Sequence, residues 1–173
     1  MNKTFKRIKP EEIRDNPFQA IGQEWMLILA GSEKKYNMMT ASWGAWGVLW
    51  HKPAAFCFIR PQRYTYEFME KARVYSLNFF DAEYKKVLDL CGSKSGRAMD
   101  KPKEAGLTAL SDEKSGALYF REARLVLICK KIYFQQIDPE HFLDPSIEAN
   151  YPQKDYHRMY AGEVIACLEK KPA

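Results

Sequence analysis

Two arginines, a tyrosine and a threonine stand close together in one segment that could bind an anion. The segment is Arg60-Pro-Gln-Arg-Tyr-Thr65, and it directly follows an apolar stretch with the character of a strand. Thr65 is placed to cap a helix through Glu67, Phe68 and Met69. Guanidinium groups, a hydroxyl and the N–H groups of a helix N-terminus together favour a phosphate. Two surface arginines beside an ordinary helix cap would give the same pattern, so the segment alone leaves both interpretations open.

A second basic segment, Gly92-Ser-Lys-Ser-Gly-Arg-Ala-Met-Asp-Lys101, is rich in glycine, hydroxyl groups and positive charge. The backbone N–H groups of such a loop can surround an anion. The segment lacks the GxxxxGK[ST] spacing of a nucleotide-binding P-loop. Since most loops of this composition are only solvated linkers, it is weak evidence by itself.

The segment Asn37–Gly44 places small and hydroxyl side chains between large apolar ones. Small side chains let a planar ring lie against the backbone, whose N–H and C=O groups can then bond the polar edge of that ring. The pyrimidine edge of a flavin alternates donors and acceptors in this way. Trp43 would stack on a ring or fill the core. A structural turn with a bulge explains the same residues.

Other kinds of site find little support. His157 lies in Asp155–Tyr160 without an evident partner, and no Ser-His-Asp or Cys-His set can be assembled for hydrolysis. The four cysteines are far apart, form no CxxC pair, and have none of the three histidines near them in the sequence. We therefore expect no metal site.

The elements that must position these segments are mostly strands. Two helices are predicted, one that begins at Thr65 and one that begins at Asp81. The second helix has a single apolar face and ends at Gly92. Gly44 and Gly47 are expected to interrupt a strand. No regular βαβ alternation occurs, so the pattern predicts a mainly β antiparallel barrel with peripheral helices. The strands are predicted over residues 25–31, 37–41, 54–60, 73–80, 124–136 and 160–168.

The whole chain of 173 residues fits one domain, 1–173, with residues 1–20 as an N-terminal arm. A net charge of +5 is well short of a polybasic nucleic-acid tail. The longest apolar stretch, Trp25–Gly31, is too short to span a bilayer. We expect a cytoplasmic protein with reduced thiols and with neither a nucleic-acid nor a membrane partner.

Taken in order, these segments resemble the flavin reductase-like, FMN-binding split-barrel family, in the branch that includes flavoredoxin. The resemblance runs from about Trp25 to Val164. It implies a Greek-key split β-barrel, a homodimer and non-covalent FMN. The matching stretches are NMMTASWGAWGVLWHKP, FIRPQRYTYEFME, YSLNFF, YKKVLDLCGSKSGRAMDK, AGLT, EARLVLICKKIYF and DYHRMYAGEV.

The resemblance also implies a set of site residues. Near the isoalloxazine and ribityl parts of the flavin it places Met39, Thr40, Ala41, Ser42 and Trp43. Around the phosphate it places Arg60, Arg63, Tyr64, Thr65, Ser95, Arg97 and Lys101. Asn78 and Phe79 occupy the strand position beside the flavin, and His157 and Tyr160 are expected near its open face as candidates for contact with substrate.

Three functions remain open at this point. The first is an NAD(P)H:flavin oxidoreductase, in which reduced nicotinamide docks on the barrel, because no GxGxxG fingerprint is present. The second is a flavoredoxin-type electron carrier with bound FMN and a redox protein such as ferredoxin as its partner. The third, from another class, is a barrel that binds single-stranded nucleic acid, although the modest charge and strand-embedded aromatic residues disfavour it.

Overall fold

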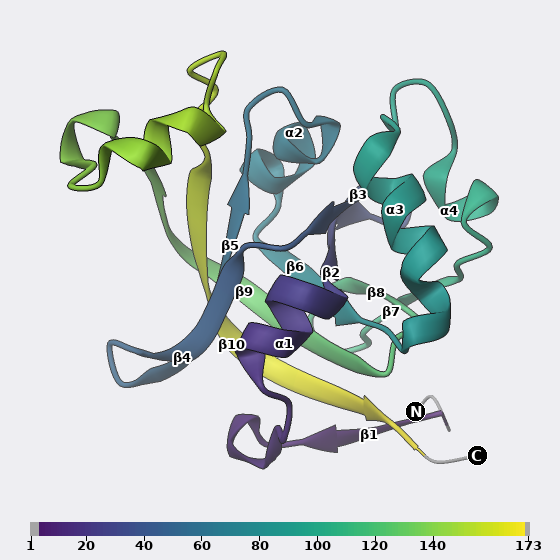
Figure 1. The fold of residues 1–173 in the computed structure, drawn as a ribbon. Coiled ribbons are helices and arrows are strands. Elements are labelled where there is room, and N and C mark those ends of the chain that lie inside the picture. The colour runs from purple at the N-terminus through teal and green to yellow at the C-terminus, as the bar shows by residue number, and fades with distance from the viewer. Residues whose placement is uncertain (1–3, 172–173) are drawn as a thin grey trace.

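A curved antiparallel β-sheet dominates the computed structural model, which describes residues 4–171 (Figure 1). The strands are β1 (Phe5–Ile8), β2 (Met26–Ser32), β3 (Lys35–Ala41), β4 (Gly44–Leu49), β5 (Lys52–Ile59), β6 (Val74–Phe79), β7 (Ala109–Ser111), β8 (Leu118–Phe120), β9 (Leu125–Gln136) and β10 (Arg158–Lys170). The α-helices are α1 (Pro17–Gln19), α2 (Tyr64–Lys71), α3 (Lys85–Ser93) and α4 (Lys101–Glu104). Short 3-10 turns cover Pro10–Glu12, Ala82–Tyr84, Pro139–His141 and Pro145–Asn150, and a π-helical turn covers Ala20–Glu24.

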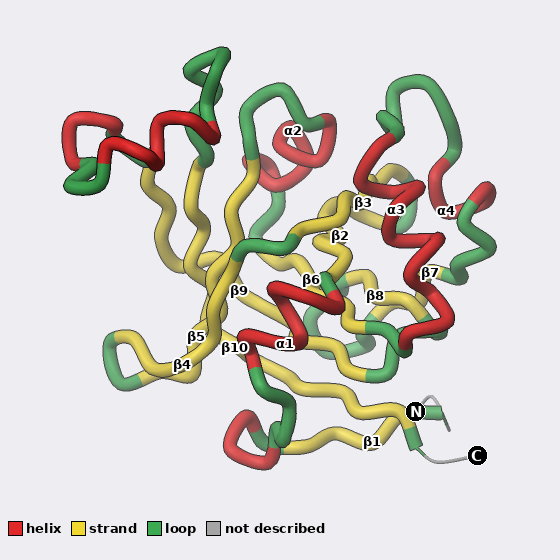
Figure 2. The backbone as a smooth tube through the Cα atoms, viewed as in Figure 1, coloured by secondary structure: helices red, strands yellow, loops and turns green. Residues whose placement is uncertain are grey.

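The strand order in the main sheet is β3-β2-β6-β9-β10-β5-β4, with β1 added to β10, and β7 and β8 form a separate hairpin. All of these pairings are antiparallel. The C-terminal strand β10 is therefore central, because it pairs with β9 on one side and β5 on the other. The mainly β prediction is confirmed, and the helices lie around the sheet (Figure 2).

Two groups of buried side chains explain why the central strands are almost continuously apolar. Ile28, Leu77 and Leu127 belong to one group, whereas their neighbours Leu27 and Val126 belong to the other. Successive side chains of a strand point to opposite faces, so a sheet covered on both faces requires apolar residues at every position. This is why the apolar runs of the sequence located these strands to within about two residues.

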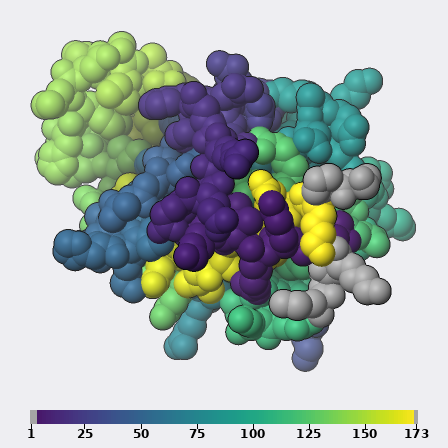
Figure 3. Space-filling view, turned by 90° about the horizontal axis from the view of Figure 1, so that it is seen from below, coloured from purple at the N-terminus to yellow at the C-terminus, as the bar shows by residue number. Residues whose placement is uncertain are grey.

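Several predictions about local structure need correction. The polar N-terminal segment contains a strand, β1, which pairs with β10 from Phe5 opposite Lys170 to Ile8 opposite Cys167. In the space-filling view this segment lies across the C-terminal strand (Figure 3). Residues Gly44–Leu49 form a separate strand, β4, rather than an interruption. Gly44 is required there because a Cβ would lie 2.8 Å from the carbonyl oxygen of Phe56 on the neighbouring strand.

Both predicted helix caps differ from those observed. Arg63, rather than Thr65, is the N-cap residue of α2, and the Thr65 hydroxyl accepts a hydrogen bond from the Asn37 side chain at 2.8 Å. Asp81 precedes a 3-10 turn without a side-chain cap bond, and α3 begins only at Lys85. That helix continues to Ser93, one residue beyond the predicted end. No described helix is long and apolar enough to cross a membrane.

Residues 138–157, between β9 and β10, form a lobe that projects from the sheet at the upper left of Figure 1. Its two 3-10 turns begin at Asp138 and Asp144, whose side chains accept hydrogen bonds from Glu140 N at 3.0 Å and Ser146 N at 2.9 Å. Tyr151 is the buried centre of the lobe, with only 3% of its surface exposed. Its ring packs against Phe142 and Tyr156.

Candidate functional site

Two adjoining cavities lie where α2, the loop after α3 and the lobe meet the ends of β3 and β5. The basic cavity, about 360 Å³, is lined by Asn37, Met39, Arg60, Gln62, Arg63, Tyr64, Thr65, Ser93, Lys94, Ser95, Gly96 and Lys101. The Trp43 cavity, about 210 Å³, is lined by Met39, Thr40, Ala41, Ser42, Trp43, Phe58, Arg60, Arg63 and His157. The two share Met39, Arg60 and Arg63, so they form one continuous site.

The basic cavity holds positive charge without a matching negative charge. Its lining contains no aspartate or glutamate. Lys101 is only 3% exposed, and its ammonium group donates to the carbonyl oxygens of Cys91 at 2.6 Å and Met38 at 3.2 Å. Burial lowers the pKa of Lys101, and the nearby Arg63 lowers it further. A buried cation that has carbonyl partners but no counterion favours binding of an anion.

Arg63 is held in place by the backbone. Its Nη1 donates to the carbonyl oxygen of Gly92 at 2.7 Å, which joins the start of α2 to the end of α3. Among residues 4–171, no carboxylate lies within ion-pair distance of Arg63 or Lys101. Both cations are therefore available to a ligand.

Asn37 and Gly96 make close contact on another wall of the basic cavity. A Cβ at Gly96 would overlap Oδ1 of Asn37, so only glycine lets the loop come this near. The Asn37 amide donates to the Thr65 hydroxyl at 2.8 Å, and Thr65 is fully buried in the first turn of α2. This contact fixes the loop of residues 93–101 against the helix N-terminus.

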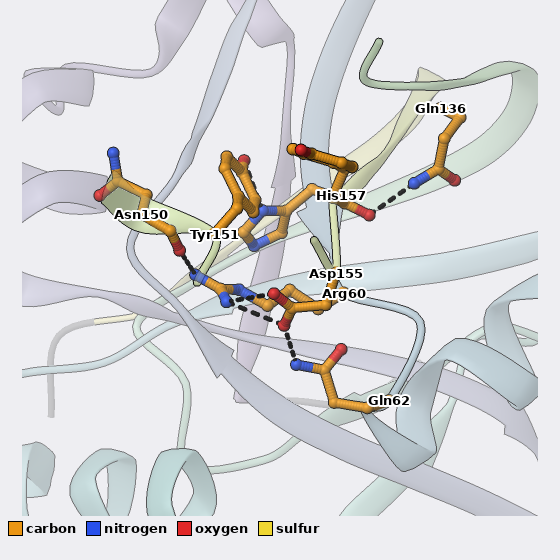
Figure 4. Close-up of polar contacts among 8 residues, drawn as sticks. Arg60, Gln62, Gln136, Asn150, Tyr151, Asp155 and His157 are labelled. Atoms are coloured by element: carbon orange, nitrogen blue, oxygen red, sulfur yellow. Dashed lines mark hydrogen bonds and ion pairs between the residues drawn. The ribbon is translucent and has the colours of Figure 1, made fainter. Parts of the chain in front are cut away.

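Arg60 is held by the lobe (Figure 4). Its Nη1 donates to both carboxylate oxygens of Asp155, at 3.1 and 2.9 Å, and its Nη2 donates to the carbonyl oxygen of Asn150 at 2.8 Å. Gln62 also donates to Asp155. The charge of Arg60 is thus partly neutralised, and Arg63 and Lys101 remain as the stronger anion-binding groups.

His157 and Trp43 face each other in the Trp43 cavity. Their ring centroids are 4.8 Å apart, and Trp43 is 42% exposed at the mouth. His157 Nδ1 lies 2.9 Å from the hydroxyl oxygen of Tyr151. Burial, followed by the positive charge of Arg60, lowers the pKa of His157 to about 4. The imidazole is therefore neutral at pH 7.

The structure brings most of the expected site residues together, but four of them do not line either cavity. Asn78 is fully buried in the sheet, where its Nδ2 donates to Leu27 O and Ser76 Oγ and its Oδ1 accepts from Phe120 N. Phe79 packs in the core against Trp46. Arg97 pairs with Glu67 and lies over the Tyr64 ring, with 4.7 Å between its Cζ and the ring centroid. Tyr160 is buried and donates to Glu70 at 2.5 Å.

Some lining residues were not selected from the sequence. Asn37 stands at the start of a segment that was selected, and Ser93, Lys94 and Gly96 belong to the basic loop, so their neighbours gave the signal. Tyr151, which contacts His157, had no signal, because the part of the lobe before Asp155 contains neither a periodic pattern nor a motif.

The donors fit a phosphate monoester joined to a flat ring. The basic cavity offers Arg63 and Lys101, which no carboxylate of the described residues neutralises, with hydroxyls and a helix N-terminus, and the Trp43 cavity adds backbone edges and an aromatic wall. The lining of neither cavity contains an acidic side chain that would repel a phosphate. Among the described residues, no group of histidine, cysteine and acidic side chains is arranged to hold a metal ion.

Comparisons with known proteins agree with this description. Residues 18–173 match the family model described as "Flavin reductase like domain". A search of curated proteins finds no match.

One similar solved structure is the FMN-binding domain of a flavin reductases-like enzyme from Shewanella baltica, with a TM-score of 0.70 and 16% sequence identity. The match covers 98% of this chain and 79% of that one. A flavoredoxin from Methanosarcina acetivorans has a TM-score of 0.65 and 22% identity, with coverage of 86% and 69%. A protein with a split barrel domain from Shewanella frigidimarina has a TM-score of 0.65 and 15% identity, with coverage of 91% and 75%. The chain therefore belongs to the flavin reductase-like family of flavin-binding oxidoreductases and has its split-barrel fold.

Proposed function

We propose that this protein is an NAD(P)H:flavin oxidoreductase that holds FMN without a covalent bond. The observation that carries the proposal is the pair of cations in the basic cavity, Arg63 and buried Lys101, neither of which has a carboxylate partner among the described residues. Arg63 is the N-cap residue of α2, where the helix dipole adds to its field. A terminal phosphate supplies the missing negative charge, which favours FMN as the cofactor.

In this proposal the phosphate binds among Arg63, Thr65, Ser95 and Lys101, with Arg60 and Tyr64 at its edge. The flavin ring lies along Met39–Trp43, in the Trp43 cavity. Arg97 does not contact the phosphate in this proposal. Its guanidinium lies over the Tyr64 ring and pairs with Glu67, so it holds Tyr64 at the edge of the phosphate site. Asn78, Phe79 and Tyr160 support the sheet behind the site rather than touching the flavin.

FMN, when bound, supplies the redox chemistry by accepting a hydride from reduced nicotinamide. The protein binds the cofactor, orients it and shields it from water. Arg60 and Arg63 line both cavities, so their positive charge acts on an anionic group in either part of the site. Trp43 and His157 border the mouth, where a nicotinamide ring would approach. No protein acid or base is required for hydride transfer itself.

Oxidation of NADH and NADPH by the purified FMN complex, with free flavin as acceptor, tests the proposal. We expect turnover with at least one of the two donors, and loss of bound flavin in Lys101→Met. Retention of flavin without turnover on either donor would refute the proposed reductase activity but not the proposed binding of FMN. A wild-type protein that does not bind FMN would overturn the whole proposal.

A flavoredoxin-type carrier is the second candidate, and the exposure of Trp43 favours it. An aromatic ring that is 42% exposed at the mouth of the cavity offers a contact for a redox protein. An acidic partner such as ferredoxin would meet the basic loop, with Lys94, Arg97 and Lys103, rather than the acidic lobe. Stopped-flow reduction by ferredoxin but not by NAD(P)H would identify this function. The family assignment gives no support to the nucleic-acid-binding alternative.

We also propose a homodimer. Val48 and Trp50 are 79% and 58% exposed at the β4–β5 hairpin, and the Trp50 ring lies 5.9 Å from Tyr133 on β9. We call these three residues the hairpin patch. Clusters of large apolar side chains on a surface are typical of contacts between subunits. A reducing compartment such as the cytoplasm is supported by the four free cysteines, all of which are buried.

A further inference from the structure

The hydroxyl of Tyr151 and the imidazole of His157 form a buried pair between the lobe and the Trp43 cavity. Tyr151 is 3% exposed and His157 is 9% exposed. The distance from the hydroxyl oxygen to Nδ1 is 2.9 Å. Figure 4 shows the two rings together above the Arg60–Asp155 pair. Their packing leaves the imidazole little freedom to turn.

The hydrogen-bond partners decide which atom of this pair donates. Nδ1 of His157 is the one acceptor in the described chain that the Tyr151 hydroxyl reaches. The hydroxyl proton is then directed to Nδ1, because a buried donor without an acceptor is costly. This arrangement places the imidazole proton on Nε2.

Nε2 is available to a ligand. No hydrogen bond of the described residues uses it, and it is not among the buried polar atoms that lack a partner. His157 lines the Trp43 cavity, whose wall includes Trp43, Met39 and Phe58. The charged groups near the imidazole are Arg60 and Arg63 from the turn after β5 and Asp155 from the lobe. The two arginines disfavour a second positive charge and so keep the ring neutral.

We propose that Tyr151 is a positioning residue that holds His157 in its Nε2–H tautomer, so that Nε2–H donates a hydrogen bond to the carbonyl oxygen of a planar, conjugated molecule at the mouth of the Trp43 cavity. The inference rests on the proposed function, which places the reacting ring in that cavity. A neutral N–H donor matches an uncharged carbonyl oxygen, and the indole of Trp43 matches a flat ring. A carboxamide or an aromatic aldehyde combines both features.

The tautomer can be read directly by long-range ¹H–¹⁵N NMR of the full chain, because it contains only three histidines. We expect the Nε2–H form for His157 at pH 7, with and without FMN, and a mixture of tautomers in Tyr151→Phe. That variant keeps the aromatic ring, and so it keeps the packing with Phe142 and Tyr156. His141→Gln, at an exposed position of the same lobe, is the matched control and should leave the signals of His157 unchanged.

Binding supplies the second measurement, with benzamide as the carbonyl probe and benzene as its counterpart without a hydrogen-bond acceptor. In the FMN complex, Tyr151→Phe should weaken benzamide binding by about tenfold and leave benzene binding unchanged. An Nδ1–H tautomer in the wild-type protein, or equal loss of both probes, would overturn the inference. Failure of the wild-type chain to bind FMN would instead refute the proposed function, because the tautomer is measured without flavin.

Discussion

Arg60 and Arg63 differ in how they are held, and this determines which of the two should matter more for the cofactor. Arg60 is paired with Asp155, whereas Arg63 has a single backbone contact, to Gly92. We expect Arg63→Ala to lower FMN affinity at least about tenfold, since a charge-assisted hydrogen bond contributes about 1.5–3 kcal/mol. Flavin fluorescence titration measures this.

Arg14→Ala is the matched control for that experiment. Arg14 is exposed and lines neither cavity, and its removal changes the net charge by the same amount. Arg124 would be a poor control, because it pairs with Asp15 and Glu24 and its loss would destabilise the fold. Equal affinities of the Arg63 and Arg14 variants for FMN would contradict the placement of the phosphate.

His157 should make the stability of the protein depend on pH. Burial and Arg60 lower its pKa in the folded state to about 4, whereas the unfolded chain has the ordinary value of about 6.5. The unfolded state therefore binds a proton first as the pH falls, and the free energy of unfolding decreases between pH 6.5 and 4. We expect a loss of about 2 kcal/mol from pH 7 to pH 5 that is absent in His157→Gln.

Urea denaturation of both proteins at the two pH values measures this difference. Other carboxylates and histidines titrate in both proteins, so subtraction isolates His157. The same loss of stability in wild type and variant would mean that the imidazole is protonated as easily in the folded state as in the unfolded one.

At the scale of elements, the close approach of the 93–101 loop to β3 depends on Gly96. Gly96→Ala would push a methyl group into the Asn37 side chain and break its hydrogen bond to Thr65. We expect FMN affinity to fall at least about tenfold, because the loop and the start of α2 move apart. Gly47→Ala, where nothing lies within 4 Å of the added carbon, should leave affinity unchanged.

The C-terminal end of α2 is fixed by Lys131 on β9. Its ammonium group donates to the carbonyl oxygens of Met69 at 2.6 Å and Glu70 at 3.0 Å, where the helix dipole is negative. We expect Lys131→Met to lower the free energy of unfolding by about 1–3 kcal/mol. Lys130→Met, at the exposed neighbouring position, should change it by less than about 0.5 kcal/mol in the same urea titration.

The sequence predicted elements well where local composition controls them, and poorly where a distant partner does. The central strands are apolar on both faces, so their runs are readable. The role of Thr65 could not be predicted from the sequence, because its partner Asn37 lies 28 residues earlier and meets it only after folding. β1 is a strand because β10 pairs with it, and its own residues Lys6 and Arg7 are exposed. Tyr151 was missed although its partner His157 is near in the sequence, because the path of the lobe brings the two side chains together.

At the scale of the whole molecule, the hairpin patch should control assembly. If the flavin site forms near the subunit contact, FMN should shift the equilibrium toward dimer by mass action. We expect Val48→Asp to weaken the dimer at least about tenfold in sedimentation over a dilution series, because a charge would be buried in the contact. Leu143→Asp, at a still more exposed apolar position on the lobe, is the control. A wild-type FMN complex that stays monomeric at micromolar concentration would exclude the dimer.

The central place of the last strand has a consequence for how the protein is made. β10 joins β9 to β5 and carries β1, yet it follows all three of these strands in the sequence. Until β10 is made, the β4–β5 hairpin and β1 have no strand that joins them to the rest of the sheet, and their apolar faces stay uncovered. Folding of the barrel should thus wait until β10 has left the ribosome. Nascent chains stalled before Arg158 should remain sensitive to protease, whereas chains stalled after a linker that exposes all of β10 should resist it.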